Sequence, residues 1–156
     1  MMKPDGHNIL HHWREAVPND RMAHLIRDTE RAFRRALQLR LAAHGVPFGH
    51  WAFLRILWEA DGLTQKELSQ RAGVMEPTTF TAMKAMEAQG YITRSQIPTN
   101  KKNVYVHLTD AGRALKKELV PLAEETNKIS VEGVAPKEIA TARKVLLAML
   151  VNLSEE

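Results

Sequence analysis

The hydrophobic pattern changes its period at Gly90, and this change constrains the fold more than any other feature of the sequence. Before Gly90, apolar residues recur at the three- and four-residue spacing of helices. Beyond it, Ile92, Val104, Val106 and Leu108 follow the alternation that is typical of β-strands. The runs YITRSQI and NVYVHLT, joined by PTNKK, therefore predict a hairpin with a basic tip over residues 98–102.

Two short helices are predicted immediately before this hairpin. Thr64, with Glu67 three residues later, forms a capping-box pattern, which starts a helix that ends at Gly73. Pro77 suits the first turn of the second helix, and Gly90 suits a left-handed C-terminal stop. Two helices joined by a tight turn and followed by a two-stranded wing make a winged helix-turn-helix.

Longer helical patterns flank this unit on both sides. We expect a short helix over 6–17, long helices over 20–45, 47–62 and 111–132, and a closing helix over 136–153. The end helices carry more apolar surface than the wing unit needs, which predicts a dimerisation platform; a larger monomeric core is the alternative. The fold class is then mainly α with a small β wing, in a single domain 1–156 with dimerisation helices 1–45 and 111–156 around a winged lobe 46–110.

Composition excludes several classes of function. The chain has no cysteine, which excludes disulfides, thiolate metal sites and thiol redox sensing. No apolar run approaches the roughly 18 residues that span a bilayer, and the N-terminus lacks a signal-peptide pattern, so we expect a cytoplasmic protein without a membrane partner. No phosphate loop, nucleophile elbow or paired-carboxylate motif appears, so we assign no catalytic residue and do not expect an enzyme.

The helix after Pro77 has an outward face suited to a DNA major groove. At 3.6 residues per turn, Thr79, Ala82, Met83 and Met86 fall on the inner side. The outer side consists of Pro77, Thr81, Lys84 and Ala88, with Thr78, Phe80 and Ala85 flanking it. Its side chains are mostly small, and one of them is a cation. Threonine hydroxyls and methyls, and the lysine, can contact base edges and phosphates. Phe80 fits an apolar contact to a thymine methyl, or alternatively packs against the hairpin or the preceding helix.

The predicted wing adds a local positive charge to a chain whose net charge is only +4. Residues 93–106 hold three cations, Arg94, Lys101 and Lys102, and no acid. Such cations can straddle phosphates or enter a narrow minor groove, and a solvated turn is the alternative. The candidate DNA-binding residues are Thr64, Gln65, Pro77, Thr78, Phe80, Thr81, Lys84, Arg94, Asn100, Lys101 and Lys102.

The order of motifs resembles the MarR (multiple antibiotic resistance regulator) family of bacterial transcription factors. The resemblance rests on LTQKELSQRAGV, PTTFTAMKAMEAQGYITR and VYVHLTDAGR, and it covers roughly residues 20–156. It implies a nucleoid-associated homodimer on a pseudopalindromic double-stranded DNA operator, which acts as a repressor and is released by a small ligand, often a phenolic or aromatic acid.

Two departures from the family pattern bear on specificity. The family usually has an arginine where Thr81 stands, so we expect less reliance on guanine. The family wing usually carries an Asp-x-Arg signature, and this chain has Asn100, Lys101 and Lys102 instead. Because lysine lacks the planar fork of arginine, we expect this wing to contribute affinity more than specificity.

The resemblance also implies a ligand pocket between the end helices and the winged lobe. The candidates are His12, Trp13, His50, Trp51 and Arg55, since aromatic rings stack and arginine pairs with a carboxylate. Trp51 is alternatively a core residue, and Arg55 alternatively forms a surface ion pair. His7 and His11 have a chelating spacing, but we assign no metal or other cofactor. The alternative functions are an architectural DNA-binding protein without an inducer and a metal-responsive regulator.

Overall fold

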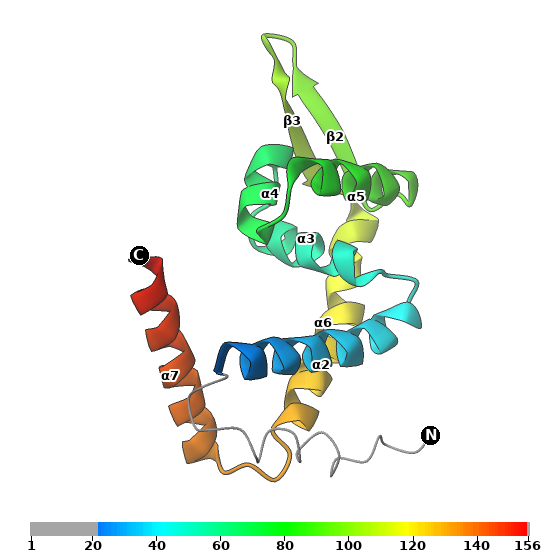
Figure 1. Ribbon diagram of the computed structural model, residues 1–156. Coiled ribbons are helices and arrows are strands. Elements are labelled where there is room, and N and C mark those ends of the chain that lie inside the picture. Colours follow the sequence, from blue (N-terminus) through cyan, green and yellow to red (C-terminus); the bar gives the residue numbers. More distant parts are fainter. Residues whose placement is uncertain (1–21, 156) are drawn as a thin grey trace.

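The computed structural model describes residues 22–155, and from Met22 onward the predicted order of helices and hairpin is confirmed (Figure 1). The predicted helix 6–17 lies outside the described residues. The elements are α2 (Met22–Ala42), α3 (Phe48–Glu59), β1 (Leu63–Thr64), α4 (Gln65–Ala72), α5 (Glu76–Ala88), β2 (Ile92–Ile97), β3 (Asn100–Leu108), α6 (Asp110–Ser130) and α7 (Pro136–Ser154).

The winged lobe contains one strand that the periodicity did not predict. Leu63 and Thr64 pair antiparallel with Val106 and Tyr105, so the sheet is three-stranded in the order β1-β3-β2. A two-residue strand is too short to show alternation, which explains why the sequence pattern missed it. The predicted basic tip over 98–102 is also corrected: the turn occupies residues 98 and 99, and 100–102 already belong to β3.

The predicted helix boundaries follow from local capping. Thr64 and Glu67 form a complete capping box at the start of α4, and Gly73 and Gly90 adopt the predicted left-handed conformation, with φ of 67° and 83°. Thr109 accepts a hydrogen bond from the Gly112 amide at the start of α6. The lobe core is a single apolar cluster under α3, α4, α5 and the sheet, which includes Leu54, Leu57, Leu68, Met83, Met86, Ile92 and Val106.

The lobe is joined to α6 by a tightly packed junction at Gly112. A Cβ added to this buried glycine would lie 2.1 Å from the backbone oxygen of Tyr91. The indole Nε1 of Trp58 donates a hydrogen bond of 3.0 Å to the Gly112 carbonyl. Asp61 accepts a hydrogen bond from the Leu108 amide, which ties the end of α3 to the last residue of β3.

Helix α2 packs across α6, and α6 contains a proline in its interior at Pro121. Leu37 and Leu41 of α2 and Leu115 and Leu119 of α6 are buried at this contact. Two ion contacts flank Pro121: Arg40 Nε lies 3.5 Å from a Glu125 carboxylate oxygen, and His44 Nδ1 lies 3.9 Å from one of Glu118. The end of α2 and the turn that follows it therefore contact α6 on both sides of the proline.

Helix α7 projects from the end of α6 and has no buried residue (Figure 1). One side of it is nevertheless apolar: Leu146 is 47% exposed and Leu150 is 67% exposed. The N-terminal half of α2 is also uncovered at Leu25, Ile26 and Phe33. Within residues 22–155, no helix is both long and apolar enough to cross a membrane.

Candidate nucleic-acid interface and ligand pocket

Helix α5 presents the two faces that the sequence predicted. Thr79, Met83 and Met86 are fully buried and Ala82 nearly so, whereas the predicted outer residues Pro77, Thr81, Lys84 and Ala88 are all exposed. Met75 caps the helix without a side-chain bond, and Pro77 occupies its first turn. The inner face is anchored to α4 through the hydroxyls of Ser69 and Thr79, whose oxygens lie 2.7 Å apart.

A groove of about 820 Å³ runs between the start of α4, α5 and the strand β3. The predicted DNA-binding residues that line it are Thr64, Gln65, Pro77, Phe80, Thr81 and Lys102. The predicted Thr78, Lys84, Arg94, Asn100 and Lys101 lie outside this lining. The sequence did not single out four further lining residues, Lys66, Glu76, Asn103 and Val104. Lys66, Glu76 and Asn103 each adjoin a predicted contact residue in the sequence, and Val104 is two residues from Lys102, so their only signal was position.

Two of the groove threonines already use their hydroxyls within the protein. Thr64 is buried; its hydroxyl accepts a 3.1 Å bond from the Glu67 amide and donates a 2.9 Å bond to the Glu67 carboxylate. Thr81 donates a 3.0 Å bond to the Pro77 carbonyl. Thr81 consequently offers its methyl group and its lone pairs, not a hydroxyl proton, to a partner in the groove.

Gln65 stands at the start of α4 with part of its amide unsatisfied. Its Oε1 atom is buried and accepts no hydrogen bond from the described residues. A buried acceptor without a partner is costly, and Gln65 lines the groove, so a donor that enters there would satisfy it.

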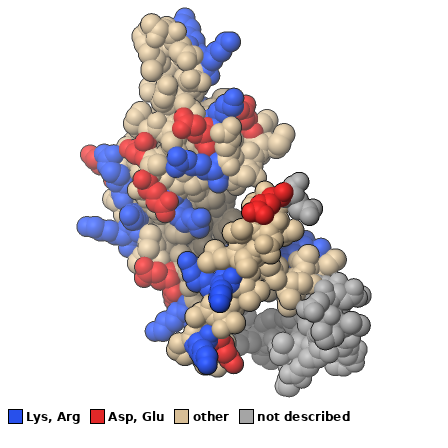
Figure 2. All heavy atoms as spheres, turned by 90° about the vertical axis from the view of Figure 1, so that its left-hand side faces the viewer, with Lys and Arg blue, Asp and Glu red and all other residues tan. Residues whose placement is uncertain are grey.

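Side chains of the hairpin form hydrogen bonds with its own backbone near Lys101 and Lys102. The Asn100 side chain accepts a 3.2 Å hydrogen bond from the backbone amide of Lys102. The side-chain amide of Gln96 donates a 2.9 Å hydrogen bond to the Lys101 carbonyl. Asn100 therefore orders the Lys102 backbone, while the Lys101 and Lys102 side chains remain exposed. In the view of Figure 2, basic side chains lie along one side of the projecting hairpin, and basic and acidic ones are interspersed below it.

Arg94 lies between β2 and α5. Its Nε and Nη2 atoms donate to the Glu87 carboxylate at 3.3 and 3.0 Å, and its side chain is 20% exposed. Hydrogen bonding from Arg94 lowers the pKa of Glu87 below its ordinary value. The guanidinium carbon also lies 5.5 Å from the centre of the Phe80 ring. The alternative interpretation of Phe80 thus holds in part, since the ring contacts the hairpin through Arg94; the ring is 51% exposed, and its contact with DNA stays a prediction.

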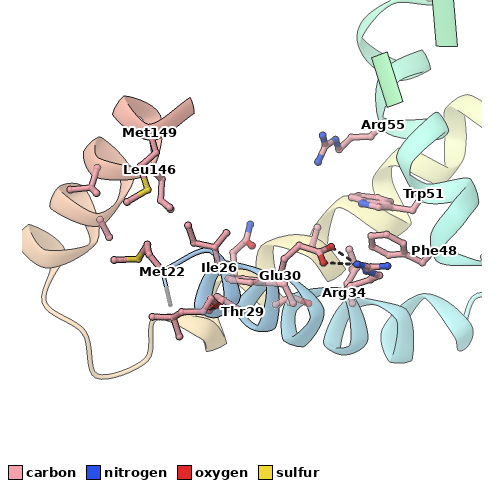
Figure 3. Close-up of a pocket in the computed structure, with 18 residues that line it drawn as sticks. Met22, Ile26, Thr29, Glu30, Arg34, Phe48, Trp51, Arg55, Leu146 and Met149 are labelled. Atoms are coloured by element: carbon pink, nitrogen blue, oxygen red, sulfur yellow. Dashed lines mark hydrogen bonds and ion pairs between the residues drawn. The ribbon is translucent and has the colours of Figure 1, made fainter. Parts of the chain in front are cut away.

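A second cavity, of about 760 Å³, lies between α2, α3, α6 and α7 (Figure 3). Trp51 and Arg55 line it as predicted, and Phe48, Arg34 and Glu30 join them. Trp51 is also a core residue, 5% exposed, with its ring edge-on to that of Trp58. The structure does not place His50 in the lining, and burial lowers the pKa of its imidazole. The predicted His12 and Trp13 lie outside the described residues.

The two arginines of this cavity differ in whether they already have a partner within the described part of the protein. Arg34 Nε donates a 3.1 Å hydrogen bond to Glu30, and the Arg34 guanidinium lies 5.8 Å from the Phe48 ring centre. Arg55 is exposed and extends from α3 toward the open side of the cavity (Figure 3). Among residues 22–155, no group of three or more histidine and carboxylate side chains is arranged to hold a metal ion, and His7 and His11 lie outside this range.

Comparison with known proteins identifies the winged lobe. Residues 49–104, from α3 into the hairpin, match the model of the MarR family. Over this segment the chain is similar to the MarR family. The HTH-type transcriptional regulator TtmR of Methylorubrum extorquens (strain PA1) is 35% identical over 85 residues, which are 54% of this chain and 44% of TtmR, so the match spans less than half of that relative.

Solved MarR-type structures share the fold beyond the matched segment. A putative MarR family regulator from Listeria monocytogenes, complexed with 26mer DNA, has a TM-score of 0.75 at 22% identity and covers 86% of this chain and 89% of that one. BpsR of Bordetella bronchiseptica, whose DNA binding is regulated by 6-hydroxynicotinic acid, has a TM-score of 0.77 at 22% identity. The match covers 83% of this chain and 98% of BpsR. These findings confirm the predicted mainly α winged fold and the predicted resemblance to the MarR family, whose members are transcription regulators and not enzymes.

Proposed function

We propose that this MarR-type regulator is a homodimer that represses its target genes by binding a pseudopalindromic double-stranded DNA site. One observation carries the proposal: the small outer face of α5 and the cationic end of β3 border the same groove. A small polar helix face fits the major groove, and lysines beside it suit the flanking phosphates. The MarR-type structure with 26mer DNA supports a DNA partner for this fold.

The proposed DNA-contact residues divide into two roles. Thr78, the Thr81 methyl, Lys84 and Phe80 are on or beside the outer face of α5 and read base edges. Lys101 and Lys102 bind phosphate, a contact that adds affinity on every sequence. Glu76 also lines the groove, and its carboxylate disfavours a phosphate at that point, which helps to fix the register of the duplex.

Selection of bound DNA from a random pool tests this function. We expect an inverted repeat whose half-sites are about one helical turn apart, roughly 34 Å. Binding to the selected site should exceed binding to random duplex by at least about 10³-fold and should weaken steeply as salt rises. Equal affinity for all duplexes would contradict the proposal and favour an architectural DNA-binding protein.

The dimer is proposed from the uncovered apolar surface of α7 and α2. An apolar helix side with no buried residue is unfavourable in water, and a second copy of the chain supplies a matching surface. In this proposal the end helices 22–45 and 111–155 make the platform, and 46–110 form the DNA-binding lobe. The platform then sets the distance between the two α5 helices.

Leu150→Glu tests the dimer, with Ala148→Glu as the matched control. The two positions are two residues apart on α7 and hence on nearly opposite sides of the helix. Leu150 is on the apolar side, so its substitution should shift the sedimentation equilibrium toward monomer, whereas Ala148→Glu should leave it unchanged. A wild-type protein that sediments as a monomer at micromolar concentration would refute the platform.

The effector is proposed to be a small aromatic or phenolic acid that binds in the cavity of Figure 3. Trp51 and Phe48 supply aromatic contacts, and the exposed guanidinium of Arg55 suits a carboxylate. BpsR, a protein of the same fold, is regulated by an acid of this class. Binding in the cavity would bias the positions of α2, α3 and α6 and so release the DNA.

Benzoate and 4-hydroxybenzoate, compared with the neutral benzamide, test this ligand class. The acids should raise the melting temperature of the wild type more than benzamide does, and they should weaken operator binding. Arg55→Gln should remove the advantage of the acids, whereas the control Lys116→Gln, outside the cavity lining, should retain it. Equal effects of acid and amide, or an unchanged response in Arg55→Gln, would exclude Arg55 as the carboxylate partner.

A further inference from the structure

Phe80, Glu87 and Arg94 form a contiguous cluster at the edge of the DNA-reading face. Phe80 and Glu87 are seven residues apart on α5, which places them on the same side of the helix, two turns apart. Arg94 reaches from β2 and contacts both, with its guanidinium over the ring and its nitrogens on the carboxylate. This cluster joins the reading helix directly to the hairpin.

The cluster holds Arg94 in a fixed position. The Glu87 carboxylate accepts bonds from Arg94 Nε, Arg94 Nη2 and, at 3.2 Å, the Arg94 backbone amide. Paired, charge-assisted hydrogen bonds between an arginine and a carboxylate limit the conformations of both side chains. Pairing of β2 with β3 also restrains the backbone of Arg94, which lies opposite Val106. Glu87 offsets the charge of this guanidinium, and Arg94 would have to break these charge-assisted bonds to turn away from Glu87 toward a DNA phosphate.

The fixed guanidinium in turn restrains the Phe80 ring. One side of the ring is covered by the cation, and the ring is still 51% exposed where α5 lines the groove. A half-exposed phenylalanine on a helix surface would otherwise exchange among rotamers, and a restrained ring loses less entropy when a partner contacts it. The ring thus presents a rigid apolar surface to the groove.

We infer that Arg94, held by Glu87, is a positioning residue that fixes Phe80 as the reader of a thymine methyl group, and that Arg94 is not a phosphate contact. The inference rests on the proposed DNA-binding function. The thymine 5-methyl is the apolar group that a major groove displays, and an aromatic edge is a suitable contact for it. Specificity at one base pair then depends on a residue of the hairpin that does not touch the DNA.

Operators with deoxyuridine in place of thymidine isolate the methyl group. At the position that Phe80 reads, wild type should prefer thymidine by about fourfold, the value expected for burying one methyl group. Phe80→Ala should reduce this ratio to about one. Arg94→Met, which keeps the length of the side chain, should do the same, and Arg94→Lys should not rescue it, because an ammonium lacks the fork that Glu87 holds.

The salt dependence of the same variants separates positioning from phosphate binding. Each phosphate that a cation binds contributes about 0.9 to the slope of log affinity against log salt. Arg94→Met should leave the slope unchanged and lower the thymidine preference. The control Lys102→Met should reduce the slope by about 0.9 for each phosphate that Lys102 binds, and it should leave the preference intact. Urea denaturation of each variant checks that it is folded.

The outcomes distinguish this inference from the proposed function. A wild type that does not discriminate its selected site from random DNA refutes the function. A wild type that binds specifically but shows no thymidine preference dependent on Phe80 refutes the inference alone. So does an Arg94→Met protein with a reduced salt slope and an unchanged thymidine preference, because that pattern identifies a phosphate contact.

Discussion

The buried hydroxyls of Ser69 and Thr79 connect α4 to α5, and substitutions there test how the reading helix is held. Their oxygens are 2.7 Å apart, and Ser69 Oγ is also 2.9 Å from the Gln65 carbonyl oxygen. Each hydroxyl has one hydrogen. Both contacts are therefore satisfied when Ser69 donates to Gln65 and Thr79 donates to Ser69.

This assignment predicts unequal effects for two conservative substitutions. Thr79→Val keeps the shape and leaves Ser69 with its bond to Gln65, so the free energy of unfolding should fall by about 0.5–1.5 kcal/mol, the net value of one hydrogen bond. Ser69→Ala leaves the Thr79 hydroxyl, which is 0% exposed, without its acceptor, and should lower the free energy by about 1–3 kcal/mol. The double variant removes both hydroxyls and should be less destabilised than the sum of the two.

Urea denaturation at a fixed protomer concentration measures these differences, since the stability of a dimer depends on concentration. The double-mutant cycle isolates the coupling between the two hydroxyls. If Ser69→Ala is no more destabilising than Thr79→Val, or if the two effects simply add, then the hydroxyl pair does not hold α4 and α5 as described.

The packing and one pKa give three further predictions. Gly112→Ala should lower the free energy of unfolding by at least about 1–3 kcal/mol, because the new Cβ meets a backbone oxygen at 2.1 Å, whereas Gly49→Ala, with no atom within 4 Å, should be neutral or slightly stabilising in urea denaturation. Burial lowers the pKa of His50, so the unfolded chain binds the proton more readily; stability should therefore decline as pH falls below the ordinary value of 6.5, and His50→Gln should flatten this part of the melting-temperature profile. Pro121→Ala restores a helical N–H donor and should raise the unfolding free energy by up to about 3 kcal/mol, measured in urea.

Local signals in the sequence were sufficient to predict most of the helices and turns of the winged lobe. The capping box at Thr64, the left-handed stops at Gly73 and Gly90, and the two faces of α5 depend on residues within one or two turns of each other, so periodicity predicted them. Strand β1 was missed because its pairing with β3 joins residues about forty positions apart, and two residues show no period.

The same limit applies to side-chain partners in the candidate sites. Arg94 was interpreted as a free cation in a stretch without acids, because Glu87, which binds it, lies in the preceding helix. The helical wheel placed Thr81 outward correctly, but it could not show that its hydroxyl proton is used by Pro77. His50 is adjacent to Trp51 in sequence yet does not line the same cavity, since adjacent helix positions point about 100° apart.

The proline in α6 has a mechanical consequence for the proposed dimer. Pro121 removes the hydrogen bond that would reach the carbonyl four residues earlier, so the helix is least stiff at that turn. The first turn of α6 packs closely against the lobe at Gly112, and Arg40 of α2 and His44 just after it contact Glu125 and Glu118 on either side of the proline. In the proposed dimer, the angle between lobe and platform would depend on how firmly α2 lies against α6, and a molecule that shifts α2 would change the separation of the two α5 helices.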